Sequence, residues 1–280
     1  MNVPCLDIDR AHLRELLPEK EEAFCVVLGQ AYRNPERLNI LLILAIEYAG
    51  CLAASTPDSA NLPRVLRVGA QAAAAVFTLA GTEPGECAAV PLGDGPAASY
   101  RCDKLLVAPD PGRWLTGFYL ATIVRDKHSK DLLCATPAQL IYSRQVHSPA
   151  YFPPLVETLR ALHRGTDSAR EHLTVARTLL AAEPFAIHEG DVGLDLDGPT
   201  IELCKRIVDD DYNGFQATLE NALLLHRAYW GQDSERRDMP AAALALGPLA
   251  MACLARDRGT EIRVVSDYLP PKLIEPAEAE

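Results

Sequence analysis

The chain has 280 residues, of which 49% are hydrophobic and 6% aromatic, and its formal net charge is −11 at pH 7. Nucleic-acid-binding proteins need a basic face and anionic membranes attract basic segments, so the acidic balance argues against both kinds of partner. The negative charge favours a basic protein partner; the alternative is that it only keeps the protein soluble. The hydrophobic content is enough for a large core, and few aromatic residues with much Ala and Leu favour helix over sheet.

Three helices are predicted in the first eighty residues. Asp9 is a candidate cap for a helix that Pro18 breaks or restarts. Asn34-Pro35 opens a second helix that runs to about Ala54, and residues 63–80 form a third with an alanine-rich run that allows close helix approach.

A β-hairpin is predicted next. Residues 86–92 and 97–102 are short segments on either side of Gly93-Asp94-Gly95-Pro96, a typical hairpin turn composition. An irregular segment, residues 103–112, follows the hairpin.

Helices then resume through the middle of the chain. An antiparallel pair is predicted on either side of residues 164–167, with Asp167 as a candidate cap. The predicted helices are residues 113–127, 130–134, 137–144, 154–163, 168–182 and 199–209.

The last third of the chain is the most regular part. Apolar residues recur every three or four positions from Phe215 to Trp230, which predicts an amphipathic helix. Residues 239–255 contain no charge, so this helix is expected to be buried, and Pro248 to kink or restart it. It ends in Arg256-Asp257-Arg258-Gly259, which is typical of a helix C-terminus.

Ile262, Val264 and Val265 predict a short strand after that helix. The predicted fold is therefore mainly α: a single-domain helical bundle or array over residues 1–280, with a small β-hairpin and a short C-terminal strand. Within this domain, residues 1–110 and 111–280 are candidate sub-lobes.

No membrane-spanning segment is expected. A span needs about 20 predominantly apolar residues. The segment 239–255 is shorter and contains Gly247-Pro248, and the apolar segment 38–54 contains Glu47, so both are interpreted as core helices. A buried carboxylate has a raised pKa unless it is paired, so a Lys or Arg partner is expected for Glu47.

The eight cysteines are scattered among apolar residues, without a C-x-x-C motif or Cys/His ligand spacing. No secretory signal is recognised in residues 1–10, so we expect a cytoplasmic protein. G-x-S-x-G, P-loop and H-E-x-x-H motifs are lacking as well. The sequence therefore predicts no catalytic residue, no metal and no cofactor.

Four segments carry a family signature through their order and spacing. They are G-R-W-L-T-G-F-Y-L-A-T-I-V-R-D (residues 112–126), F-Q-A-T-L-E-N-A-L-L-L-H-R-A-Y-W (215–230), L-G-P-L-A-M-A-C-L-A-R-D-R-G (246–259) and S-D-Y-L-P (266–270). Together they resemble the immunity 49 proteins of bacterial polymorphic toxin systems. The resemblance implies a cytosolic protein, encoded beside a toxin, that binds the toxin and blocks it.

Two interpretations stay open for the polar residues of these segments. His226 is either a general base or metal ligand, or a core histidine held by a hydrogen bond. We favour the core histidine, because no carboxylate or second histidine lies at ligand spacing from it. The Arg-Asp helix ends either form a binding pocket, or cap helices and make internal ion pairs. We favour the second interpretation. The residues concerned are Trp114, Arg125, Asp126, His226, Trp230, Arg256, Asp257, Asp267 and Tyr268.

An acidic segment is the predicted binding surface. No basic residue lies between Arg177 and Lys205, and residues 187–198 resemble an exposed loop. We expect this surface to meet a basic toxin domain; the alternative is a solvated loop that maintains solubility. Its residues are Glu183, Glu189, Asp191, Asp195, Asp197, Asp209, Asp210 and Asp211.

The predicted function is stoichiometric binding and neutralisation of a cognate secreted bacterial toxin, which protects the producing cell and its kin. Two alternatives remain: a helical adaptor, which a fixed repeat period would support, and an enzyme that reverses toxin damage. The sequence does not indicate an oligomeric state.

Overall fold

The computed structural model describes residues 2–4, 10–102, 109–142, 148–182 and 193–275. It is 70% helical and its sheet has two strands, which confirms the mainly α prediction. Contacts divide the chain into an N-terminal unit, Arg10–His147, and a C-terminal unit, Met1–Asp9 with Ser148–Glu280. The boundary lies after His147 because the helix that begins at Pro111 packs on the one that ends at Ala80. The single-domain organisation stays a prediction.

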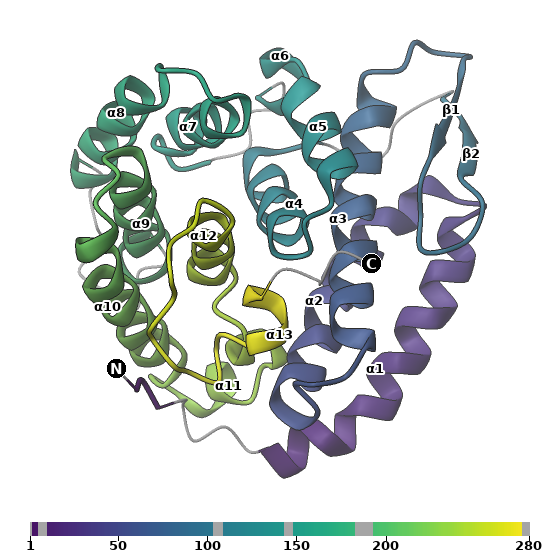
Figure 1. Ribbon diagram of the computed structural model, residues 1–280. Helices are drawn as coiled ribbons and strands as arrows, with labels where there is room; N and C mark the ends of the chain where they lie inside the picture. The colour runs from purple at the N-terminus through teal and green to yellow at the C-terminus, as the bar shows by residue number, and fades with distance from the viewer. Residues whose placement is uncertain (1, 5–9, 103–108, 143–147, 183–192, 276–280) are drawn as a thin grey trace. The chain divides into compact units, whose positions relative to one another are not determined.

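The N-terminal unit consists of helices, of which the first five α-helices each pack on the next and the short sixth packs on the third (Figure 1). They are α1 (Arg10–Ala31), the 3₁₀ helix η1 (Pro35–Arg37), α2 (Leu38–Ser55), α3 (Asn61–Ala80), α4 (Pro111–Ile123), α5 (Lys127–Ala135) and α6 (Ala138–Ile141). Asn34 caps η1 by accepting a hydrogen bond from the Glu36 backbone nitrogen at 3.0 Å, as the Asn-Pro pair predicted.

Pro18 does not break α1, contrary to our prediction. The helix runs through it without interruption, and Pro18 is exposed. The proline removes one backbone donor, but packing of α1 on α2 stabilises the helix on both sides of it.

The alanine-rich part of α3 brings helices close together, as predicted. Ala72, Ala73, Ala74 and Ala75 are all buried. A Cβ placed on Gly117 of α4 would lie 2.6 Å from the Ala73 Cβ, which is closer than real side chains approach. The α3–α4 contact therefore depends on small residues on both helices.

The predicted hairpin is confirmed as β1 (Cys87–Val90) and β2 (Ala98–Arg101), which pair antiparallel with Val90 opposite Ala98. The Tyr32 hydroxyl donates to the Leu92 carbonyl oxygen, and the Gly93 nitrogen donates to Gln71 Oε1 at 2.7 Å. These hydrogen bonds join the hairpin to the end of α1 and to α3.

The C-terminal unit is a second helical array. It consists of α7 (Phe152–Arg164), α8 (Ala169–Ala182), the π-helical turn η2 (Gly193–Asp197), α9 (Gly198–Val208), α10 (Tyr212–Trp230), α11 (Ser234–Arg237), the 3₁₀ helix η3 (Pro240–Ala243), α12 (Leu246–Asp257) and α13 (Pro271–Ile274). The predicted α7–α8 pair is confirmed, with a turn at Gly165 whose φ is +66°. Helix α9 packs on α8, α10 and α12.

The predicted C-terminal strand is wrong. Of residues 262–265, only Val265 pairs in β geometry within the described residues, through an isolated parallel bridge to Asn2. Gln216 of α10 takes the place of a neighbouring strand: its Nε2 donates to the Glu261 carbonyl oxygen at 2.7 Å, and its Oε1 accepts from the Arg263 nitrogen at 2.9 Å. The extended segment is therefore held by a side chain instead of a ladder.

The helical stretch Pro35–Ser55 is long and apolar enough to cross a membrane by length and composition alone, and 56% of it is buried within the structure. The Lys20 Nζ lies 2.8 Å from Glu47 Oε2, so this carboxylate has the basic partner that we predicted. The hydrogen bond from Lys20 to Glu47 raises the pKa of the lysine.

Candidate interaction surfaces

His226 is a core residue of the C-terminal unit. It lies on the predicted apolar face of α10, with Phe215, Leu219 and Leu223, and is 4% exposed. Its Nε2 donates to the Ala242 carbonyl oxygen at 3.0 Å. Burial lowers the pKa of the imidazole to about 4, so it is neutral at physiological pH. The hydrogen-bonded core interpretation is confirmed.

An aromatic cluster surrounds this histidine. Its ring centroid lies 4.8 Å from that of Tyr268, edge to face, and 6.0 Å from that of Trp230. Tyr268 is fully buried, whereas the neighbouring Asp267 is exposed. The S-D-Y-L-P segment is thus anchored by its tyrosine against α10, and these motif residues stabilise the fold.

Trp114 has a similar structural role in the N-terminal unit. It is fully buried, stacks on Phe118 with centroids 5.1 Å apart, and donates from Nε1 to the Leu133 carbonyl oxygen at 2.8 Å. These contacts fix α5 on α4.

The two Arg-Asp pairs make structural contacts at helix ends. Asp126 caps α5, where it accepts hydrogen bonds from the Ser129 nitrogen and hydroxyl. Arg125 has a φ of +56° and donates to the Ile123 carbonyl oxygen at 3.1 Å. In the other unit, Arg256 pairs with Glu275 at 3.0 Å, and Asp257 is the last residue of α12. Capping and internal pairing, the interpretation that we favoured, account for these contacts.

The predicted acidic loop falls partly within the described residues. Glu183, Glu189 and Asp191 lie outside the described residues. Asp195 and Asp197 belong to the helical turn η2, which continues directly into α9, and Gly198 is buried. The exposed-loop prediction is therefore wrong for residues 193–198. The Tyr151 hydroxyl donates to Asp197 Oδ2 at 2.8 Å, which holds the turn against the start of α7.

The acidic run at 209–211 connects α9 to α10. Asp209 accepts ion pairs from Arg170 of α8 at 2.5 Å and from Lys205 at 2.7 Å. Asp211 pairs with Arg206 and caps α10 through the Gly214 nitrogen. The lysine hydrogen bond lowers the pKa of Asp209, and the Gly214 hydrogen bond lowers that of Asp211.

Asp210 differs from its two neighbours. Its φ is +53°, and it accepts a hydrogen bond from the Tyr212 hydroxyl at 2.9 Å. It makes no ion pair among the residues that the structure describes. Most of the negative charge that the sequence places at 209–211 is thus neutralised within the protein, and Asp210 is the acid that remains for a partner.

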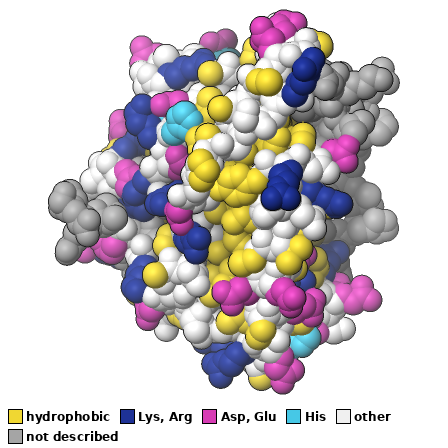
Figure 2. All heavy atoms as spheres, turned by 90° about the vertical axis from the view of Figure 1, so that its right-hand side faces the viewer, with side chains coloured by type: hydrophobic (Ala, Val, Ile, Leu, Met, Phe, Trp, Pro, Cys, Tyr) yellow, Lys and Arg dark blue, Asp and Glu magenta, His cyan; other side chains and the backbone are white. Residues whose placement is uncertain are grey.

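A second surface lies on the side of the N-terminal unit that carries α1. Figure 2 shows a stripe of hydrophobic side chains running down this face between charged ones. Val26 of α1 and Ile40 and Ile43 of α2, all in the N-terminal unit, are exposed by 51%, 40% and 54%. The run Cys25-Val26-Val27-Leu28 could have indicated this surface, because four consecutive apolar residues of a helix cannot all face one core.

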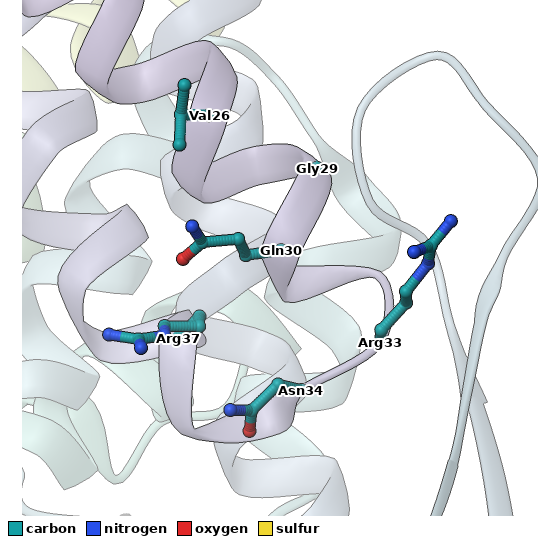
Figure 3. A pocket seen from close by; sticks show the side chains of 6 residues that line it. All are labelled: Val26, Gly29, Gln30, Arg33, Asn34 and Arg37. Atoms are coloured by element: carbon teal, nitrogen blue, oxygen red, sulfur yellow. The ribbon is translucent and has the colours of Figure 1, made fainter.

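An open pocket of about 490 Å³ lies where α1 turns into η1. In Figure 3, the Gln30 and Arg37 side chains extend to the same side, whereas Arg33 extends to the other side of the turn. The two guanidinium groups therefore flank the end of α1. The lining residues are Val26, Gly29, Gln30, Arg33, Asn34 and Arg37.

Comparison with known proteins assigns the chain to a family. A family model described as Immunity protein 49 matches residues 56–273. The match begins directly after α2 and ends within α13, so it includes most of both units, while α1 and α2 precede it. Neither curated proteins nor solved structures gave a match. Because the family match covers most of the chain, this protein belongs to the immunity protein 49 family.

Proposed function

We propose that this protein neutralises a cognate bacterial toxin by forming a stoichiometric complex with it in the cytoplasm, and so protects the producing cell and its kin. The observation that carries the proposal is the family match over residues 56–273, which spans the α3–α4 contact and the His226 core. Membership of an immunity family implies a toxin as the partner.

The chemistry of the described residues supports binding as the mode of action. The aromatic and Arg-Asp residues of the motif segments pack and cap helices, so their contacts are those of a scaffold. The cysteines that the structure describes are all free thiols, which suits a reducing cytoplasm.

Co-expression with the toxic domain encoded beside this gene tests the proposal. Cells that make the toxin should survive when the two proteins are present in equal amounts, and the purified mixture should elute as one complex. Survival with a large excess of toxin would instead favour an enzyme that reverses the damage. Death at every ratio would contradict neutralisation itself.

The acidic surface is the proposed contact with a basic toxin domain. Asp210→Asn with Asp191→Asn removes two negative charges while asparagine retains the tolerance for positive φ that residue 210 needs. We expect weaker toxin binding and a smaller loss of affinity on adding salt, because complementary charge contributes less.

The matched control is Glu83→Gln with Glu86→Gln, two exposed acids beside the hairpin. This variant should bind the toxin as the unmodified protein does. If the 191/210 variant also retains its affinity and salt dependence, the acidic surface is not the contact, although neutralisation stands.

A further inference from the structure

We propose that residues 261–265 form a docking edge for an extended peptide segment, and that residues 2–4 of the same chain occupy it as a detachable strap. Both segments belong to the C-terminal unit, whereas α1, which begins at Arg10, belongs to the N-terminal unit. The chain therefore contributes to the C-terminal unit twice, once before α1 and again from Ser148 onward. The proposal is independent of toxin binding.

The docking edge belongs to a segment with the side-chain pattern of a strand. The side chains at odd positions from 261 to 267 are exposed, whereas Val264, Ser266 and Tyr268 are buried. This period of two is that of an extended segment with one face on the core. Its end carries Tyr268, which packs on His226 of α10. Whatever holds the docking edge therefore also supports this core contact.

The hydrogen bonds to the segment fall on one edge. In an extended strand the N–H and C=O of one residue point to the same edge, and those of the next residue point to the opposite edge. The backbone groups of Glu261, Arg263 and Val265 thus share an edge. Gln216 bonds to Glu261 and Arg263, and the Val3 nitrogen donates to the Val265 carbonyl oxygen at 3.0 Å. The strap continues along the edge where the glutamine side chain ends.

Val3 is the anchor of the strap. Its side chain is 2% exposed, whereas Asn2 and Pro4 on either side of it are exposed. Burial of one valine side chain favours the docked state by about tenfold to a hundredfold. Helix α10, by comparison, buries Phe215 and Leu219 along with several other residues. The strap can therefore detach while the rest of the unit stays folded.

This geometry defines the kind of peptide that the edge accepts. The bridge between Asn2 and Val265 is parallel, so the peptide is extended and runs in the direction of residues 261–265. Main-chain hydrogen bonds provide affinity for any sequence, and the buried position of Val3 requires a small apolar side chain there. Detachment leaves an edge that can pair with a strand of another chain. The family match contains the docking edge and begins after the strap.

Hydrogen exchange of single backbone amides, measured by NMR on the isotope-labelled protein, tests the proposal. The Val3 amide should exchange about tenfold to a hundredfold more slowly than in an unstructured chain, because it is bonded to Val265 while the strap is docked. The amides of Leu223 and His226 in α10 should exchange far more slowly still, because they are released only when the unit unfolds.

Val3→Asp should release the strap, because it places a carboxylate at a buried position. The amide of residue 3 should then lose its protection, and the Val265 amide on the same edge should exchange about tenfold faster or more. The Arg263 amide should be unaffected, since Gln216 still holds it. Asn2→Asp is the matched control: it adds the same charge at the exposed neighbouring position and should leave the strap docked.

Circular dichroism verifies that each variant is folded, and Val3→Ala, which should give an intermediate loss of protection, replaces Val3→Asp if that variant is not. Three results would overturn the proposal. An unprotected Val3 amide in the unmodified protein would show that the strap is not docked. Protection equal to that of the α10 amides would show that it does not detach. A Val265 amide that the Val3 variants leave unchanged would show that the strap does not cover this edge.

Discussion

Protonation of His226 is expected to destabilise the protein as the pH falls. The imidazole is buried, its Nε2 donates to the Ala242 carbonyl oxygen, and burial lowers its pKa from 6.5 to about 4. Between these two values the unfolded chain binds a proton that the folded chain does not bind, so the free energy of unfolding decreases as the pH decreases. The pKa difference corresponds to a loss of about 2 kcal/mol by pH 5 and about 3 kcal/mol by pH 4.

Urea unfolding at a series of pH values measures this loss. Tryptophan fluorescence follows the unfolding of both units, because Trp114 lies in one and Trp230, 6.0 Å from the imidazole ring, lies in the other. The perturbation is His226→Gln, which keeps an amide donor for the Ala242 oxygen but has no charge at any pH. This variant should be less stable at pH 7, because it loses the edge-to-face contact with Tyr268.

The decisive quantity is the difference in unfolding free energy between the unmodified protein and the variant. It should shrink by about 2 kcal/mol between pH 7 and pH 5, because only the unmodified protein has this titration. His128→Gln, which changes an exposed histidine of α5, is the control and should leave the pH profile unchanged. If the difference for His226→Gln is the same at both pH values, burial does not control the protonation of this histidine.

Three substitutions in the N-terminal unit test its packing by the same unfolding measurement. Gly117→Ala should cost about 1–3 kcal/mol, because its Cβ would lie 2.6 Å from the Cβ of Ala73; an unchanged midpoint would show that α3 and α4 separate easily. Gly29→Ala should stabilise α1 by about 0.5–1 kcal/mol, because no atom lies within 4 Å of the added Cβ. A loss of stability would contradict this open environment. Glu47→Gln should cost about 1 kcal/mol by removing the half-buried partner of Lys20, and this cost should vanish in a Lys20→Met background.

Local sequence signals were sufficient for much of the fold. Asn34-Pro35 specified the start of η1, and the turn residues 93–96 specified the hairpin, with φ of +65° at Gly93. The apolar spacing after Phe215 placed His226 on the buried face of α10. These features depend on residues within about one or two turns of one another, which is the range over which propensity and periodicity act.

The strand at 262–265 and the acidic loop were wrong because their outcome depended on distant residues. The backbone at Glu261 and Arg263 bonds to Gln216, 45 and 47 positions away, so it needs no neighbouring strand. Asp209 pairs with Arg170, 39 positions before it. A charge count along the chain cannot include such partners, because only folding brings them within the few ångströms over which ion pairs form.

The sequence by itself thus determined the helices, the hairpin, the buried histidine and the resemblance to an immunity family. Only the tertiary structure decided which charges remain available. It neutralised most of the acidic run at 209–211 and left Asp210, and it left Glu22 and Val26 of α1 exposed. The physical reason is that helix formation is governed by neighbouring residues, whereas exposure and pairing are governed by whichever elements pack alongside.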